Sequence, residues 1–354
     1  MSKFDFIKRT ITEGTIARDR KLDYRETENY YRDISRALSI ENFPLISVNT
    51  IEKKTYMLQG SDGQCYLVFD HYLLEYMHLL NQFAVAKEPS LQVGSLFNKI
   101  LSEECFTQHK INAAVRFAAR YLENTSEVIR EYMEPKNEGV LPDYLFVQQA
   151  FLIAHELFHF YVHRNPHYDE EGIRSKKGFL DRIYKYVLAG NPDTAEFIRK
   201  AIMEDRMAEE CLCDSTAVIQ AIDAGVKTGK LDAADSGVAA ALALMNQYTI
   251  STIQDTVKHF GDMTYERLQN LFNFRIVHLK AFTNLYLREY YTDEAVSLYR
   301  TKVEEIHKQW FERVNTPIMH MLVNNYVLLK ELPASVGGEK DRDLIDTLRR
   351  IYNS

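Results

Sequence analysis

The sequence predicts an α+β fold that is predominantly helical, in which a small antiparallel sheet near the N-terminus is followed by a helical body. Glycine and proline are scarce, with 14 and 8 copies in 354 residues, and this favours long helices over many short strands and turns. Residues 44–70 are rich in β-branched and aromatic residues, whereas helical periodicity dominates from Tyr72 onward.

Three segments within residues 44–70 predict the strands of the sheet. They span residues 45–50, 55–59 and 64–69, where β-branched and aromatic residues alternate or cluster. The Gly-Ser-Asp-Gly sequence at residues 60–63 is typical of a hairpin turn between the second and third segments. We therefore expect a small antiparallel sheet, preceded by a helix over residues 27–38.

The helical signals divide the chain into an N-terminal α/β portion, residues 1–140, and a helical portion, residues 141–354, which can also form one continuous domain. Pro142 and Asp143 predict the start of a helix that reaches about His163. Asn191 predicts a second start, and the pattern continues, as one helix or two, to a stop at Gly225.

The composition restricts the class of protein. A net charge of -7 and a pI of about 5.9 give no basic nucleic-acid footprint. No stretch approaches the roughly 20 apolar residues of a membrane span, and the N-terminus lacks the apolar core of a secretory signal. Four cysteines in a chain of this size do not make a disulfide framework. These features predict a cytoplasmic protein that binds neither nucleic acid nor membrane.

The segment FLIAHELFHFY, residues 151–161, contains an HExxH motif within an almost wholly apolar helix. His155 and His159 lie about 40° apart around that helix and one turn apart along it, so both imidazoles can reach one cation. Glu156 points about 100° away from His155, where it can reach a water on the metal. Burying these polar groups is costly unless they are paired or bind a metal, which favours a zinc site.

A catalytic zinc needs a third protein ligand, and residues 207–214 are its best source. Met203, Met207, Glu210 and Asp214 recur at helical spacing and form a core-facing stripe, whereas Glu209 falls on a more polar neighbouring face. We therefore expect Glu210 to bind the metal and Asp214 to accept a hydrogen bond from a ligand histidine. Alternatively, the two acids pair with a buried arginine or lysine.

Three other side chains near the motif receive structural interpretations. His163 lies a full turn beyond His159, which favours a cation at the carboxyl end of the helix over a third ligand from the same helix. Cys211 and Cys213 point about 160° apart on a helix, so they cannot both bind one ion. We expect both cysteines to be packing residues.

HExxH followed by E-x-x-x-D on a later helix resembles the gluzincin metallopeptidases, of which thermolysin is the familiar example. The resemblance covers these two helices. It implies a zincin-like catalytic body in which His155, His159 and Glu210 bind one Zn²⁺ per chain, Glu156 is the general base and Asp214 supports a ligand histidine. A broader similarity is to the intracellular HExxH peptidases of phage exclusion such as Lit. The sequence lacks the H-x-x-G-x-x-H extension of metzincins after His159.

The resulting hypothesis is a zinc-dependent endopeptidase that hydrolyses peptide bonds of an intracellular protein, with Glu156 taking a proton from a zinc-activated water. Relatives hold the oxyanion with a downstream His, Tyr or Arg. Here Arg275 and His278 share one face of a predicted helix and are the candidates, with Tyr265 as a further option. The zincin resemblance also implies that an edge strand within residues 44–70 binds an extended peptide.

Two other functions remain open at this stage. One is a zinc-stabilised, non-catalytic regulatory or binding protein, although a structural zinc has no need of Glu156. The other is a helical interaction protein whose HExxH motif arose by chance. The expected inward orientation of Glu210 and Asp214 argues against this second alternative.

Overall fold

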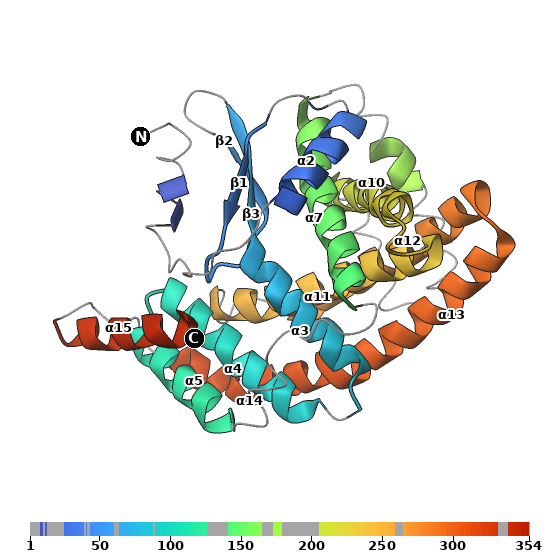
Figure 1. Cartoon of the computed structure of the whole chain (residues 1–354). Helices are drawn as coiled ribbons and strands as arrows, with labels where there is room; N and C mark the ends of the chain where they lie inside the picture. Colours follow the sequence, from blue (N-terminus) through green and yellow to red (C-terminus); the bar gives the residue numbers. More distant parts are fainter. Residues whose placement is uncertain are drawn as a thin grey trace.

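The computed structural model describes residues 8–9, 11–12, 25–38, 40, 43–59, 64–87, 89–125, 141–164, 173–178, 205–258, 265–331 and 339–353. The strands are β1 (Leu45–Val48), β2 (Tyr56–Gln59) and β3 (Cys65–Asp70). The longer helices are α2 (Arg25–Ala37), α3 (His71–Val85), α4 (Ser90–Thr107), α5 (Ile111–Asn124), α7 (Leu141–Arg164), α10 (Asp205–Thr228), α11 (Ala233–Lys258), α12 (Tyr265–Tyr290), α13 (Asp293–Trp310), α14 (Thr316–Glu331) and α15 (Glu339–Asn353), with a π-helical turn, Phe311–Asn315, between α13 and α14. The predicted predominance of helix over a small sheet is confirmed (Figure 1).

The sheet is mixed, so the predicted all-antiparallel sheet is wrong. β2 and β3 are antiparallel, as expected for the two strands that flank residues 60–63, which lie outside the described residues. β1, however, pairs with β3 in parallel, giving the strand order β1-β3-β2. The reason is the connection from β1 to β2, residues 49–55, which is long enough to pass over the end of β3 instead of forming a tight hairpin.

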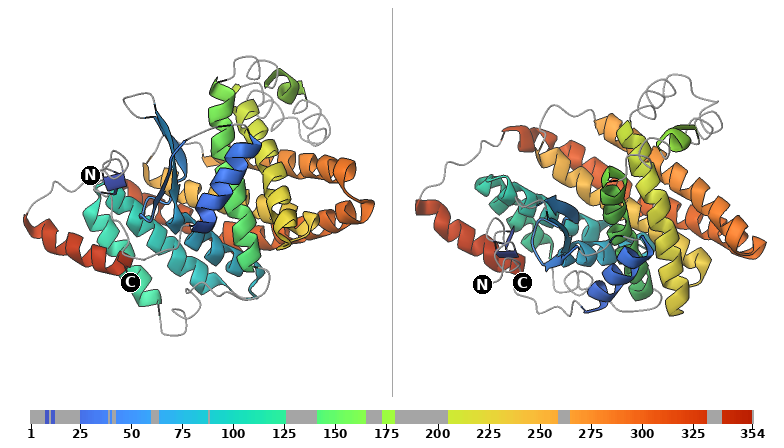
Figure 2. Two further views of the ribbon diagram at one scale, coloured as in Figure 1. Left: turned by 45° about the horizontal axis from the view of Figure 1, so that its top comes forward. Right: turned by 90° about the horizontal axis from the view of Figure 1, so that it is seen from above.

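Helix α7 lies at the centre of the fold. It packs against β2, α2 and α3, and also against α10 and α11. In Figures 1 and 2 the sheet lies on one side of α7, and α10 lies on the other. The prediction of a helix over about residues 142–163 is confirmed. Because apolar side chains surround α7 on nearly every face, the helix can be buried between these two layers.

Helix α10 ends later than predicted, and Gly225 allows close helix packing instead of ending the helix. The predicted stop at Gly225 is wrong, because α10 continues to Thr228 and is followed by Gly229 in the left-handed region at φ 66°. A Cβ at Gly225 would lie 2.1 Å from Oγ of Ser236 and 3.1 Å from Cγ2 of Val147. Gly225 therefore allows α10 to approach α11 and α7 closely. The predicted start at Asn191 lies outside the described residues.

One large hydrophobic core joins residues from α2 to α15 and includes side chains from both sequence portions. A smaller cluster, formed by Ile46, Val48, Tyr66 and Val68, covers the other face of the sheet. Among the described helices, none has the length and apolar character needed to cross a membrane.

Candidate metal centre

Helix α7 presents both histidines of the motif on one face. His155 is almost fully buried at 5% exposure, and His159 is partly buried. Their Nε2 atoms are 3.1 Å apart, and their rings meet edge to face with centroids 4.8 Å apart. The one-turn spacing thus brings two imidazole nitrogens to a single point.

Helix α10 brings Glu210 to the same point. Its Oε2 lies 3.5 Å from Nε2 of His155, and its Oε1 lies 3.8 Å from Nε2 of His159. Ligand atoms at about 2.0–2.1 Å around a tetrahedral zinc ion lie about 3.3 Å from one another. Within the described residues, His155, His159 and Glu210 form a group whose ligand atoms lie within 4.8 Å of one another and could hold a metal ion. Their separations fit a tetrahedral ion.

Each histidine has a carboxylate at its other ring nitrogen. Nδ1 of His155 lies 3.0 Å from Oδ1 of the fully buried Asp214, close to the predicted partner but outside hydrogen-bond geometry. Nδ1 of His159 lies 2.6 Å from Oε1 of Glu209. A carboxylate therefore lies on the Nδ1 side of each ring, and Nε2 of both rings lies at the common point.

The sequence reasoning missed Glu209 because it assigned this residue to the polar face of α10. A signal for its position was nevertheless available. A ligand histidine that binds through Nε2 needs an acceptor at Nδ1, and Glu209 is the acid adjacent to the expected ligand Glu210.

Arg275 of α12 completes the cluster. Its Nε and Nη2 donate to Asp214 at 2.9 and 2.8 Å, and its Nη1 lies 2.9 Å from Oε2 of Glu210. The alternative interpretation, in which the two acids pair with a buried arginine, therefore also describes the structure. Burial, the largest single cause, would raise the pKa of both acids, but Arg275 and His155 together outweigh it and lower the pKa of Glu210 and of Asp214.

The histidines differ in their electrostatic surroundings. Burial alone would lower the pKa of His155, but Asp214 and Glu210 outweigh this effect and raise it to about 10. Burial and the neighbouring His155 lower the pKa of His159. The carboxylates around His155 thus favour positive charge at this point, and a divalent cation could supply that charge in place of a proton.

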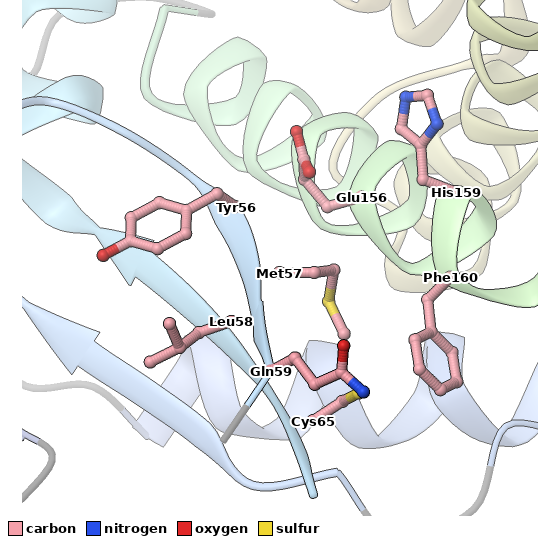
Figure 3. A pocket seen from close by; sticks show the side chains of 8 residues that line it. All are labelled: Tyr56, Met57, Leu58, Gln59, Cys65, Glu156, His159 and Phe160. Atoms are coloured by element: carbon pink, nitrogen blue, oxygen red, sulfur yellow. The ribbon is translucent and has the colours of Figure 1, made fainter. Parts of the chain in front are cut away.

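Glu156 lies in the wall of a pocket of about 630 Å³ between α7 and β2. Figure 3 shows its carboxylate on the same side of α7 as the ring of His159, while Met57 and Gln59 of β2 point toward the helix. Burial is the main cause that raises the pKa of Glu156 to about 7. A carboxylate with this pKa, in a pocket next to a cluster of metal-binding side chains, is suited to exchange protons near neutral pH.

The structure places His278 away from this pocket. Its ring is fully buried, and its Nε2 lies 3.4 Å from both Nζ of Lys176 and Oγ of Ser215. Burial and the nearby Lys176 lower its pKa to about 3. His278 therefore packs behind Asp214, and of the two expected oxyanion candidates only Arg275 reaches the described cluster. The side chains of Tyr265 and His163 lie outside the described residues.

Cys211 and Cys213 are free thiols with fully buried side chains. Cys213 packs with Phe158 and Val162 of α7 and with Leu212, directly beside the cluster. Burial raises the pKa of both thiols. Cys213 thus lies in the packing interface between α7 and α10, whereas Cys211 contacts Met207 within α10, and both thiols are held neutral.

No family model matches the chain, and no match was found among curated proteins or among solved structures, so the interpretation of the site rests on its own geometry and chemistry.

Proposed function

We propose that the chain is a zinc-dependent endopeptidase, in which His155, His159 and Glu210 bind the metal and Glu156 is the general base. The observation that carries this proposal is the convergence of three ligand atoms from α7 and α10, at separations of 3.1–3.8 Å, beside a carboxylate in a pocket wall. Two imidazoles and one carboxylate are a ligand set of catalytic zinc sites, which leave a fourth position for water or substrate.

A zinc ion held there would polarise a peptide carbonyl and make a bound water more acidic. Glu156 then accepts the proton of the attacking water and delivers it to the leaving amine nitrogen. Its pKa of about 7 allows it both to accept and to release a proton near neutral pH. Glutamine at this position would keep the shape of the pocket but could not carry the proton.

Arg275 acts in this proposal as a positioning residue. All three of its guanidinium nitrogens contact the carboxylates of Asp214 and Glu210. This arrangement fixes the rotamers of both acids and keeps them ionised, so that Glu210 is ready to bind a cation and Asp214 to orient His155.

The substrate would lie along β2. This strand forms one edge of the sheet, and residues from it line the same pocket as Glu156 and His159. An extended peptide that adds to the open edge of β2 would pass in front of Glu156, and backbone hydrogen bonds would hold it regardless of its sequence. Because all four cysteines are free thiols, we place the enzyme and its protein substrate in the reducing cytoplasm.

Glu156→Gln provides the direct test. Zinc content and cleavage of denatured casein are measured for the wild type and for this variant, both loaded with one equivalent of zinc. We expect one zinc per chain in both proteins, and a loss of cleavage of about 10²–10⁴-fold in the variant. Equal cleavage by both proteins would exclude this mechanism. Zinc binding without cleavage by either would favour the alternative, a zinc-stabilised regulatory protein.

A further inference from the structure

A fully buried ion pair lies beside the start of β2, outside the metal centre. Nζ of Lys53 lies 2.8 Å from Oε2 of Glu103, and both side chains have 0% exposure. The hydroxyls of Tyr72 and Tyr76 donate to the same carboxylate at 2.6 and 2.7 Å. We call these four residues the Lys53 cluster. It joins the β1–β2 connection to helices α3 and α4.

A lysine at position 53 costs free energy for two reasons, its backbone conformation and the burial of its charge. Its φ of 55° lies in the left-handed region that favours glycine. Its ammonium is also buried, and it donates to the carbonyl of Ile51 in the same turn as well as to Glu103. Burial alone would raise the pKa of Glu103, but Lys53, Lys99 and the hydrogen bond from Tyr72 together outweigh it and lower that pKa, so Glu103 stays ionised. An apolar residue or a glycine would avoid these costs.

The ion pair restricts the conformation of the turn. Apolar packing would allow the turn several arrangements, whereas three hydrogen-bond donors around one carboxylate allow few. The same connection has two further polar anchors. Asp70 accepts from the backbone N–H of Thr50 at 3.0 Å, and Gln254 of α11 donates to the carbonyl of Glu52 at 3.0 Å. Three anchors within four residues hold the chain just before it enters β2.

The strand that these anchors precede has few other supports. β2 spans four residues and is partly exposed along its length, and among the described strands it has a hydrogen-bonded neighbour on one side only. Its residues Met57 and Gln59 nevertheless form the pocket wall opposite Glu156 and His159 (Figure 3). The position of this wall therefore depends on the turn that leads into it.

We infer that the Lys53 cluster positions the edge strand β2 for substrate, so that Lys53 and Glu103 set how well an extended peptide binds beside Glu156. This inference rests on the proposed peptidase function for its catalytic consequence, but its structural part stands by itself. Lys53 and Glu103 do not touch the reacting atoms; they act through β2.

The test uses the double variant Lys53→Met/Glu103→Gln. It replaces the charged pair with neutral side chains of similar size. The amide oxygen still accepts from one tyrosine hydroxyl, and the amide NH2 can donate to the other hydroxyl oxygen, so the protein is expected to fold. The matched control is Lys302→Met, which removes an ion pair with Asp235 at 2.7 Å between α13 and α11, far along the chain from β2. Both proteins are compared with the wild type in the zinc-loaded state.

The first readout is amide hydrogen exchange followed by mass spectrometry. In the double variant we expect exchange over residues 51–59 to accelerate by at least about tenfold, with α7 and α10 unchanged. The control should leave residues 51–59 unchanged. Unaltered exchange over residues 51–59 in the double variant, or acceleration spread equally over the whole chain, would overturn the inference.

The second readout is the cleavage of a fluorogenic peptide that carries a bond found to be cleaved in denatured casein. We expect KM to rise about tenfold with kcat within about twofold, because β2 contributes to binding and not to proton transfer. A fall in kcat at unchanged KM, or a loss of zinc, would contradict the inference. If the wild type cleaves no peptide, the proposed function fails, and hydrogen exchange alone decides whether the cluster holds β2.

Discussion

At the scale of single residues, adjacent glutamates of α10 face different ring nitrogens of the histidines. Glu210 faces Nε2 of both histidines, whereas Glu209 contacts Nδ1 of His159. A rotation of about 100° per residue separates the two side chains, so one reaches the metal position and the other the outer edge of the ring. The register of α10 therefore decides which glutamate would bind a metal in the proposed site.

Substitution of each glutamate by alanine separates these two positions. We expect Glu210→Ala to lose stoichiometric zinc, because two ligands remain. Glu209→Ala should keep zinc but bind it about 10–100-fold more weakly, because His159 loses the acceptor that orients it. Mass-spectrometric metal analysis combined with chelator competition measures both. Loss of zinc in Glu209→Ala with normal binding in Glu210→Ala would show that the ligand assignment is reversed.

His278 gives a prediction on pH. An unfolded histidine has a pKa near 6.5, whereas the buried His278 has a folded-state pKa of about 3. Between these values the unfolded chain binds a proton that the folded chain does not. The contribution of His278 is therefore fully present above about pH 6.5 and is lost as the pH falls, at about 1.4 kcal/mol for each unit of pKa difference.

The comparison is between the wild type and His278→Gln, by urea unfolding at pH 7 and pH 4.5. We expect the free energy of unfolding to fall between these pH values by at least about 1 kcal/mol more in the wild type than in the variant. Zinc binding at pH 7 should be retained in the variant, because His278 lies behind the site. The same pH dependence in both proteins would contradict the assigned burial.

At the scale of helices and strands, local patterns predicted the elements but not their partners. β1 and β2 lie within the predicted segments, and β3 ends one residue beyond its segment, at Asp70, since β-branched and aromatic runs mark the strands. The parallel pairing of β1 could not be predicted, because it depends on where residues 49–55 pass. Gly225 was misinterpreted for a similar reason. A glycine near a helix end is typical of a helix stop. Only the packing of the helices shows that Ser236 leaves no room for a side chain at Gly225.

Three helices are held in register by buried amides. Asn81 of α3 and Gln148 of α7 exchange two hydrogen bonds of 3.0 Å, and Asn246 of α11 donates to Asn81 at 2.7 Å. All three side chains have 0% exposure. Because α7 carries His155 and His159 of the candidate metal centre, this network also fixes their position along the helix axis relative to α3 and α11.

Asn81→Ala removes the shared partner of this network. The side-chain amides of Gln148 and Asn246 would stay buried but lose their hydrogen bonds with Asn81. We expect this loss to lower the free energy of unfolding by about 2–3 kcal/mol. Urea denaturation measures the change. The control is Asn325→Ala, which removes an exposed hydrogen bond with Arg120 and should change stability by less than about 0.5 kcal/mol. Equal effects of the two substitutions would show that the buried network contributes little.

At the scale of the whole molecule, the core crosses the boundary expected near residue 140. The same cluster contains Tyr72 and Phe97 from the N-terminal portion together with Phe151 and Trp310 from the helical portion. The division into residues 1–140 and 141–354 stays a prediction. The shared core leads us to expect one cooperative unfolding transition for the described elements.

Zinc should shift that transition, since the ligands come from α7 and α10 and converge only in the folded chain. At a free zinc concentration of about 100 times Kd, we expect stabilisation of about 2.7 kcal/mol, and removal of the metal by a chelator should lower Tm correspondingly. Calorimetry with and without chelator measures this. A Tm that does not respond to zinc would mean that no native site exists.

The candidate site could be predicted in part because its spacing along the sequence is short. His155, Glu156 and His159 lie on one helix, and Glu210 and Asp214 lie on another, so helical geometry alone relates the members of each group. The position of Arg275 could not be predicted in this way. Its contacts with both acids depend on how α12 packs against α10, and no local pattern encodes that packing.

The central claim is that two imidazoles and one carboxylate from two helices bind a single ion beside Glu156. X-ray absorption spectroscopy at the zinc edge on the zinc-loaded full chain tests it most directly. We predict two imidazole nitrogens at about 2.0–2.1 Å and oxygen ligands at about 2.0–2.2 Å, with the oxygen contribution reduced in Glu210→Ala. Sulfur at about 2.3 Å, or one imidazole in place of two, would contradict the account.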